Sequence, residues 1–447
     1  MAWKRMALQG WGRVTRAETL ASRPERQREV APLLLAPEAA PGVIAYGGGR
    51  SYGDVALNSG GATLLTQRLN RLLDFVPDTG LLVCEAGVTF QDILRTFLPR
   101  GYAAPVSPGT AFVTIGGAIA NDVHGKNHDR HGSFGDHLAW IELVLPDGRL
   151  VRASREEEAE LFAATIGGLG LTGLILRAAF HLQNAPSTHF VVHERRLPDL
   201  QSFMAAFAEV RRQATYSVGW IDGVARGGQL GRGILQTAEY ATGEVPRARP
   251  ARERRMPVDL PALALNRHSV RLFNEAYFRR VPAAGRERIL PVEQFLYPLD
   301  AVLDWNRLYG KRGFYQLQCV LPDAAAERGL PALMERVAEA GAASFLAVLK
   351  TLGERGRGYL SFPLPGFTLA LDLPARPETP ALMAQLEAMI LDHGGRVYLA
   401  KDACLSPEGF RRMYPELPHL QAVLQRVDPA GRMRSDMARR LQIHGAA

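Results

Sequence analysis

The stretch AYGGGRSYGD, residues 45–54, decides which fold the sequence predicts. It continues the apolar run VIAY (43–46), which we expect to be a strand, and it places three consecutive glycines before Arg50 and Ser51. Glycine has no side chain in the way, so consecutive backbone N–H groups can close on a diphosphate. The spacing differs from the dinucleotide fingerprint GxGxxG, because Gly53 comes one residue too late and no long helix is expected to follow. The stretch predicts a phosphate-binding loop of another kind, with a plain glycine turn as the alternative.

A second glycine segment, SPGTAFVTIGGAIANDVHGKNHDRHGSFGDHL, spans residues 107–138. Gly116 and Gly117 open a short predicted helix that ends at Asn121, and such small residues let a flat ring lie against the backbone. Four histidines that follow lack accompanying cysteines or a carboxylate pattern, so we expect no metal site. We interpret the segment as a cofactor-facing loop. The histidines are His124, His128, His131 and His137.

A literal GxGxxG occurs at Gly168, Gly170 and Gly173, but the elements around it come in the wrong order. It follows a predicted helix and precedes the strand GLILRAAFHL (173–182), whereas a dinucleotide site places the pyrophosphate at a helix N-terminus. We therefore reject it as a dinucleotide fingerprint. Its glycines still permit close approach to a cofactor.

Short strands and helices alternate through the first 180 residues, as in α/β structures. LLVCEAG (81–87) predicts a strand, and Thr89 is expected to cap a helix whose apolar residues recur at helical spacing. Residues 137–153 predict a hairpin, because Pro-Asp-Gly makes a turn between two alternating strands. The glutamates of REEEAELFAATI (155–166) open another predicted helix, where negative charge suits the helix dipole.

The composition is that of a globular protein with a large core. At 447 residues, 47% of them hydrophobic, the chain predicts two or three domains. Lys+Arg number 53 against 45 Asp+Glu, which favours anionic partners, but the arginines are scattered and we expect no nucleic-acid binding. Three distant cysteines predict neither a disulfide framework nor a zinc site. We see no signal peptide or membrane span, and expect a cytoplasmic protein.

Six motifs together resemble the decaprenylphosphoryl-ribose oxidase family of vanillyl-alcohol-oxidase-type flavoproteins. They are GWGR (10–13), GRSYGD (49–54), VTIGGAIANDVHGKNH (113–128), SFGDH (133–137), YSVGWID (216–222) and VYLAKD (397–402). The resemblance implies an α+β fold with a PCMH-type FAD-binding domain of two α/β subdomains, built from residues 1–183 and 395–447. A substrate-binding domain of antiparallel sheet with helices, residues 184–394, is expected between them. Its Pro- and Arg-rich stretch 243–261 is expected to be a mobile loop.

The resemblance also implies which residues bind FAD. Arg50 stands where many sugar-alcohol and lactone oxidases of this fold carry a flavin-linking histidine, so FAD should be non-covalent. The residues expected to bind it are Gly47, Gly48, Gly49, Arg50, Ser51, Tyr52, Gly53, Asp54, Gly109, Thr114, Ile115, Gly116, Gly117, Asn121, Asp122, His124, Gly173, Ile175 and Tyr398.

Lys401 and Tyr398 are the expected catalytic residues. Oxidation of a secondary alcohol removes the hydroxyl proton as hydride leaves the carbon, and a desolvated lysine can accept that proton. The alternative is a surface lysine bridged to Asp402. The substrate-binding positions that the resemblance implies, for which plain exposure is the alternative, are Lys126, Trp220, Gln316, Gln318, Lys350 and Lys401. Cationic lysines suit a phosphodiester-linked sugar.

The expected reaction is FAD-dependent oxidation of the C2 hydroxyl of a polyprenyl-phosphoryl pentose to the 2-keto sugar, the first half of an epimerisation in cell-envelope synthesis. A separate NADH-dependent short-chain reductase is the expected functional partner, and the lipid substrate implies peripheral contact with the inner membrane. Two alternatives stay open. One is an O2-dependent oxidase of a free sugar, alditol or aldonolactone, and the other is a non-catalytic flavoprotein that binds polyprenyl phosphates.

Overall fold

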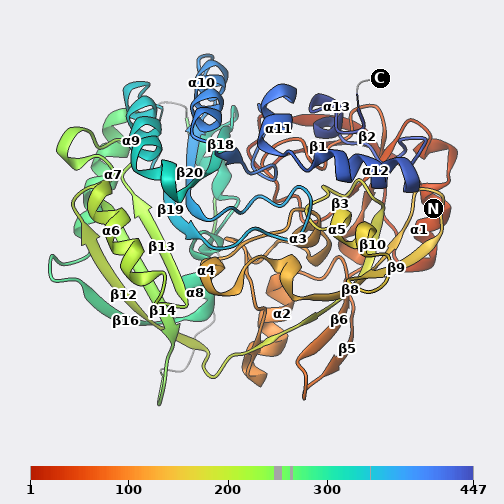
Figure 1. Ribbon diagram of the computed structural model, residues 1–447, viewed down its shortest axis with the longest axis horizontal. Coiled ribbons are helices and arrows are strands. Elements are labelled where there is room, and N and C mark those ends of the chain that lie inside the picture. The colour runs from red at the N-terminus through yellow and green to blue at the C-terminus, as the bar shows by residue number, and fades with distance from the viewer. Residues whose placement is uncertain (1, 246–253, 262–264, 343, 446–447) are drawn as a thin grey trace.

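The computed structural model describes residues 2–245, 254–261, 265–342 and 344–445. Figure 1 shows a large sheet with its helices on one side of the molecule, and two smaller sheets with the C-terminal helices on the other. The fold is therefore a mixed α+β structure in which the two ends of the chain lie in the same half.

The first sheet has the strand order β1-β2-β4-β3. Its parallel core pairs β2 and β3 with β4, and β1 is antiparallel to β2. The C-terminal segment joins this sheet, because Val43 N–H donates to the carbonyl of Arg432 at 2.8 Å and Val43 also bridges to Met433. The strands are β1 (Lys4–Gln9), β2 (Arg16–Ser22), β3 (Val43–Tyr46) and β4 (Ala62–Leu65).

The second sheet is antiparallel, in the order β5-β6-β10-β8-β9. The expected hairpin over residues 137–153 is present as β8 and β9, paired from Trp140 opposite Ser154 to Val144 opposite Leu150. The expected cap at Thr89 is also present, since its hydroxyl accepts from Asp92 N–H. The strands are β5 (Leu72–Val76), β6 (Leu81–Glu85), β8 (Leu138–Val144), β9 (Leu150–Ser154) and β10 (Leu174–His181).

The third sheet is antiparallel and eight-stranded, in the order β16-β12-β14-β13-β19-β20-β18-β21. All residues of β13 are buried, because helix α6 packs on this part of the sheet from one face. The approach is close at Gly219, where an added Cβ would lie 2.6 Å from the Phe203 ring. The strands are β12 (His189–Leu197), β13 (Tyr216–Ile221), β14 (Gly233–Tyr240), β16 (Arg286–Pro291), β18 (Phe314–Pro322), β19 (Ala347–Leu352), β20 (Gly366–Pro374) and β21 (Arg396–Val397).

Helices pack against all three sheets, with α9 and α10 on the β18–β21 end of the large one. The helices are α1 (Val30–Leu34), α2 (Phe90–Phe97), α3 (Ile115–Ala120), α4 (His128–His131), α5 (Ala159–Thr165), α6 (Leu200–Val210), α7 (Arg267–Arg279), α8 (Val292–Leu296), α9 (Asp323–Glu339), α10 (Thr379–Asp392), α11 (Pro407–Met413), α12 (Leu417–Val427) and α13 (Asp436–Arg440).

Two of the expected segments have long-range partners in the structure. The predicted domain boundary at residue 395 is crossed by the large sheet, because β21 pairs with β18. Within the loop expected at 243–261, residues 246–253 lie outside the described residues. The part from residue 254 is anchored, since β15 (Arg254–Arg255) pairs with β17 (Val302–Leu303) and Asp259 bonds to Arg13 at 2.7 Å. Sequence bias toward Pro and Arg did not reveal these long-range partners.

Candidate active site

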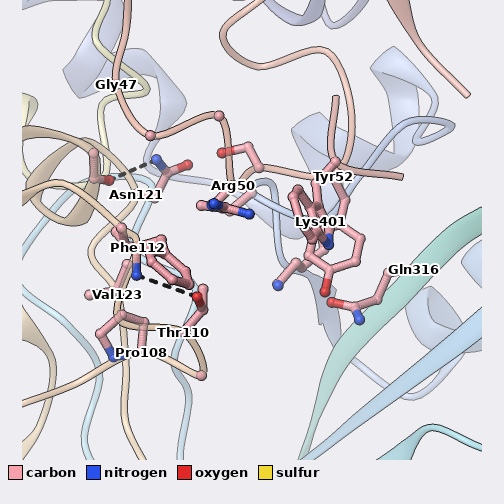
Figure 2. Close-up of a pocket in the computed structure, with 18 of the residues that line it drawn as sticks. Gly47, Arg50, Tyr52, Pro108, Thr110, Phe112, Asn121, Val123, Gln316 and Lys401 are labelled. Carbon is pink, nitrogen blue, oxygen red and sulfur yellow. Dashed lines mark hydrogen bonds between the residues drawn. The ribbon is translucent and has the colours of Figure 1, made fainter. Parts of the chain in front are cut away.

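A cavity of about 570 Å³ lies at the junction of the three sheets, within the size range of roughly 300–1,000 Å³ that is usual for small-molecule and cofactor sites. Its lining brings together the glycine loop 47–53, the second glycine segment, strands β13, β18, β19 and β20, and the loop after β21. In Figure 2, Gly47 and Asn121 lie on one side of it and Tyr52, Lys401 and Gln316 on the opposite side.

Most of the residues expected from the sequence line this one cavity. They are Gly47, Gly48, Gly49, Arg50, Ser51, Tyr52, Gly53, Gly109, Thr114, Gly116, Gly117, Asn121, His124, Lys126, Gly173, Ile175, Trp220, Gln316, Gln318, Lys350, Tyr398 and Lys401. The role of each toward a ligand stays a prediction.

Three expected cofactor-binding residues lie outside the cavity lining. Asp54 points to the C-terminal helix α13, where Arg440 bonds to both of its carboxylate oxygens. Ile115 is fully buried in the main hydrophobic core. Asp122 adopts a left-handed backbone (φ 40°), and its buried carboxylate accepts from Gly135 N–H at 3.0 Å and from the Ser361 hydroxyl at 2.5 Å. The role of these three residues toward the cofactor stays a prediction.

The glycine loop is held against the segment that carries Lys401. Tyr52 N–H donates to the Ala400 carbonyl at 2.9 Å, and an added Cβ on Gly53 would lie 1.7 Å from the carbonyl oxygen of Asp402. No side chain fits at that contact, so glycine is required by the close approach of two backbones. The glycine loop therefore packs directly against the segment that carries Lys401.

Arg50 extends from the glycine loop into the cavity. Its guanidinium lies over the rings of Trp11 and Phe112, at 4.3 and 4.8 Å from their centroids. Burial lowers its pKa, while Asp300 opposes that shift. A cation held between two aromatic rings at the entrance of a glycine loop suits a phosphate-bearing ligand.

The second glycine segment presents polar atoms to the cavity that have no partner among the described residues. Thr114 caps helix α3 through Gly117 N–H, and Asn121 ends it. The side-chain oxygen of Asn121 and Nδ1 of His124 are buried without a hydrogen-bond partner within that part of the chain. Buried polar groups are normally hydrogen-bonded, so these two atoms fit a ligand that supplies the missing partners.

His124 is uncharged in this environment. Burial lowers its pKa well below the ordinary value, and Lys350, His128 and Lys401 lower it further. The Gln318 side-chain nitrogen lies 2.9 Å from Nε2, so with that amide as donor the ring proton is on the unpartnered Nδ1. Nδ1 of His124, a residue of the cavity lining, is thus a neutral donor without a partner among the described residues. The other three histidines of this segment do not line it.

Lysine is rare in this chain but concentrated in the cavity. Of five lysines among 53 Lys and Arg residues, three line it: Lys126, Lys350 and Lys401. Burial lowers the pKa of Lys126 to about 7, of Lys350 to about 8 and of Lys401 to about 7. Lysine, unlike arginine, can lose its proton near neutral pH when it is buried. This use of lysine suits proton transfer.

Each cavity lysine has a defined contact. Lys401 Nζ lies 3.8 Å from the centroid of the Tyr52 ring, and Lys350 Nζ donates to the Gly125 carbonyl at 3.4 Å. Lys126 Nζ donates to the carbonyl of Phe295. Tyr398, expected beside Lys401, donates from its hydroxyl to the Asn121 carbonyl at 3.0 Å. The alternative of merely exposed lysines is therefore not met at these positions.

Sequence reasoning missed several residues around the cavity. Trp11 and Phe112 contact Arg50, although Trp11 stands in a motif that the resemblance had included. Asp372 was also missed, and it lies directly behind Gln316. A signal was present, because a carboxylate inside the apolar strand FTLALDLP is costly to bury and calls for a specific partner.

Comparison with known proteins agrees with this geometry. A family profile described as FAD binding domain matches residues 21–154, and one described as D-arabinono-1,4-lactone oxidase matches residues 371–441. The first contains the two glycine segments up to the β8–β9 hairpin, and the second contains Lys401.

Individual proteins are also similar to the chain, over different shares of their length. The chain is 34% identical to decaprenylphosphoryl-β-D-ribose oxidase of Mycolicibacterium smegmatis, over 98% of this chain and 97% of that protein. An uncharacterized protein of Streptomyces coelicolor is 36% identical over 79% of this chain and 100% of that protein. Cytokinin dehydrogenase 8 of Oryza sativa is 31% identical over 39% of this chain and 36% of that protein.

The similarity to the M. smegmatis protein spans both glycine segments, the large sheet and the loop that carries Lys401. The matched profiles assign an FAD binding domain to the N-terminal part and an oxidase segment to the C-terminal part. The chain therefore belongs to the decaprenylphosphoryl-β-D-ribose oxidase family and is an FAD-linked oxidoreductase that acts on CH–OH groups.

Proposed function

We propose that the protein oxidises the C2 hydroxyl of a polyprenyl-phosphoryl pentose to a 2-keto sugar. The observation that carries the proposal is the placement of Lys401 in the cavity, over Tyr52 and against the glycine loop. Since burial brings its pKa to about 7, Lys401 can take the hydroxyl proton at physiological pH. The M. smegmatis relative is named for the corresponding substrate, decaprenylphosphoryl-ribose.

The proposed cofactor is non-covalent FAD, held by the glycine loop 47–53 and the second glycine segment. The chemistry that FAD supplies when bound is acceptance of a hydride from the alcohol carbon. Arg50 and the backbone of the glycine loop would hold the phosphates of FAD. The unpartnered polar atoms of Asn121 and His124 would form hydrogen bonds with FAD or with the substrate. Arginine offers no nucleophile at neutral pH, which supports the non-covalent mode.

The remaining cavity wall supports a lipid-linked, anionic substrate. Lys126 and Lys350 supply positive charge for a phosphodiester when protonated. Another part of the wall is apolar and could lie along the first units of a polyprenyl chain. The apolar residues that line it include Trp220, Leu296, Leu299, Val302, Leu303, Leu346 and Val348.

We also propose peripheral contact with an anionic membrane face, through helix α7. Leu272 is 75% exposed and Phe273 47% exposed, Arg267 and Arg271 are exposed beside them, and Tyr277 of the same helix lines the cavity. Exposed apolar and basic residues on one helix suit an anionic lipid surface. No helix within the described ranges is long and apolar enough to cross a bilayer. Sedimentation with phosphatidylglycerol vesicles should fall for Leu272→Glu, and equal binding of variant and wild type would contradict the contact.

Completion of an epimerisation requires a second enzyme. The 2-keto sugar must regain a hydride on its other face, and we propose that a separate NADH-dependent short-chain reductase supplies it. Addition of such a reductase and NADH to the reaction should yield the C2 epimer. Recovery of the unchanged pentose alone would count against this partnership.

The decisive experiment is an anaerobic absorbance titration of the flavin-loaded protein with synthetic polyprenyl-phosphoryl ribose. The oxidised flavin band should disappear in wild type, and its rate of loss should fall about 10²- to 10⁴-fold in Lys401→Ala. Lys311→Ala is the matched control, because Lys311 is exposed and outside the cavity. A wild-type band that persists would overturn the proposed substrate.

One further candidate function has a specific observation in its favour. The lactone-oxidase profile matches residues 371–441, which supports an oxidase of free sugars, alditols or aldonolactones. This function predicts rapid hydrogen peroxide release with a free pentose or lactone, and no requirement for the lipid. Comparing the flavin reduction rate with free and with polyprenyl-phosphoryl ribose separates the two.

A further inference from the structure

Lys401 is acted on by a buried carboxylate that does not itself line the cavity. Asp372 lies on β20 directly opposite Gln316 on β18, and it is 1% exposed. Its charge is the one that raises the pKa of Lys401, against burial and the repulsion of Lys350. Burial raises the pKa of Asp372 to about 7, against the lowering by its hydrogen bonds with Gln316 and Tyr309 and by the charge of Lys401. The two groups are thus electrostatically coupled inside the protein.

A continuous set of contacts connects the two residues. The Gln316 side-chain nitrogen donates to Oδ1 of Asp372 at 2.5 Å, and Gln316 also shares a hydrogen bond with the Tyr52 side chain. The Tyr52 ring carries the Lys401 ammonium group on its face at 3.8 Å. Figure 2 shows Tyr52, Lys401 and Gln316 gathered at this wall of the cavity. A substitution of Asp372 therefore affects Lys401 through the Gln316 side chain and the Tyr52 ring.

The far side of Asp372 is also fixed. The Tyr309 hydroxyl donates to Oδ2 at 3.1 Å and lies 2.9 Å from the Ser344 hydroxyl. Both carboxylate oxygens are consequently hydrogen-bonded by neutral groups. Burying a charged carboxylate costs several kcal/mol unless nearby groups compensate it, so an acid at this position calls for a cation. Lys401 is the cation whose charge lowers the pKa of Asp372.

We propose that Asp372 is a positioning residue, which holds the Lys401 side chain on the Tyr52 ring and favours its ammonium form between turnovers. The inference rests on the proposed role of Lys401 as proton acceptor. The other charged or titratable groups that face the pair are Lys350 and His124 beside Lys401, and Tyr309 and Tyr52 beside Asp372. Of these, Lys350 opposes protonation of Lys401, which leaves Asp372 to balance it.

The sign of the effect is fixed by the charge. Removing the carboxylate as Asp372→Asn keeps the size of the side chain and a hydrogen-bond acceptor for Gln316, but removes the attraction on the ammonium group. The pKa of Lys401 should then fall by about one unit, a tenfold loss of proton affinity. Because the neutral amine is the proton acceptor, the acid limb of the flavin reduction rate should move to lower pH by the same amount.

The test is an NMR titration of the lysine side chains, which is practicable because the chain has five lysines. Flavin-loaded protein labelled with ¹³Cε-lysine gives signals from five side chains, and the one lost in Lys401→Ala is assigned to Lys401. Its chemical shift is titrated against pH in wild type, Asp372→Asn and the control Asp300→Asn. Asp300 is a carboxylate of the same cavity that faces Arg50 and does not act on Lys401. A lower pKa of Lys401 in Asp372→Asn alone supports the inference. An unchanged pKa, or an equal decrease in Asp300→Asn, overturns it.

A second variant covers a failure of Asp372→Asn to fold. Gln316→Leu keeps the carboxylate but cuts its hydrogen-bonded connection to Tyr52, so the Lys401 titration should shift and broaden as the side chain loses its fixed position. An unchanged titration in that variant would also overturn the inference.

The two proposals can fail separately. If wild-type flavin is not reduced by the lipid-linked sugar, the substrate proposal fails while the lysine titration still tests Asp372. If reduction depends on Lys401 but its pH profile is the same in Asp372→Asn, the function stands and the inference fails.

Discussion

Both carboxylate oxygens of Asp54 accept hydrogen bonds from the guanidinium group of Arg440, at 2.9 and 2.7 Å. The same guanidinium donates to Asp402 at 2.9 Å, one residue after Lys401. Asp54 comes at the end of the glycine loop and Arg440 in the last helix. The ion pair therefore ties the two ends of the chain together directly behind the cavity.

Replacing Arg440 with methionine should destabilise the protein strongly. The side chains of Asp54 and Asp402 are 10% and 1% exposed, so the substitution leaves two carboxylates buried without their cation. Breaking one partner of such a buried pair costs about 3 kcal/mol. The midpoint of urea unfolding measures this loss.

The matched control for Arg440 is Arg426→Met. Arg426 pairs with Glu158 at 3.0 Å, but both side chains are more than two-fifths exposed. An exposed pair contributes no more than about 1 kcal/mol. Equal losses in the two variants would show that the position of Arg440 behind the cavity has no special importance.

Two glycines, Gly53 in the cavity lining and the exposed Gly228 outside it, should respond differently to alanine. At Gly53 a Cβ would lie 1.7 Å from the Asp402 carbonyl, so Gly53→Ala must push the glycine loop away from the lysine segment. Such overpacking costs about 1–3 kcal/mol, and the purified protein should contain less flavin. At Gly228 no atom of the described residues lies within 4 Å of an added Cβ, and Gly228→Ala should keep both stability and flavin content. The ratio of flavin to protein absorbance measures the outcome, and equal loss in both variants would contradict it.

Local features of the fold could be predicted from the sequence because their causes are local. The glycine loop, the Thr89 cap and the hairpin over residues 137–153 each depend on a few neighbouring residues, and the structure has all three. Two of the cavity lysines, Lys126 and Lys401, also follow from their motifs. Most of the candidate site was accessible in this way.

Long-range partners could not be predicted from the sequence. Asp54 looked like part of the cofactor loop, but its partner Arg440 is 386 positions away in the chain. Asp372 became visible only once β18 and β20 were paired in register, which places it opposite Gln316. Burial and pairing across a sheet depend on the whole fold, so a short motif does not contain them.

Flavin should leave the protein when it is denatured in acid. Arg50 occupies the loop position at which, by the resemblance, many related oxidases carry a flavin-linking histidine, and it has no nucleophilic nitrogen at neutral pH. His124 is the histidine that lines the cavity, and Gln318 engages its Nε2. Acid precipitation should therefore leave the yellow colour in the supernatant, and colour retained in the washed pellet would contradict non-covalent binding.

Lys126 should make stability depend on pH. Burial lowers its pKa from 10.5 to about 7, so between these values the unfolded chain binds more protons than the folded protein, and stability rises with pH. The destabilisation is fully present below pH 7 and is relieved as the pH rises. One proton corresponds to about 1.4 kcal/mol per pH unit. Between pH 7 and 8.5 the free energy of unfolding should therefore increase by about 1–2 kcal/mol more in wild type than in Lys126→Met. Lys311→Met, at an exposed site, should show no such change. Urea unfolding of the flavin-loaded proteins at several pH values measures the difference, and parallel curves for wild type and Lys126→Met would mean that Lys126 keeps its proton inside the cavity.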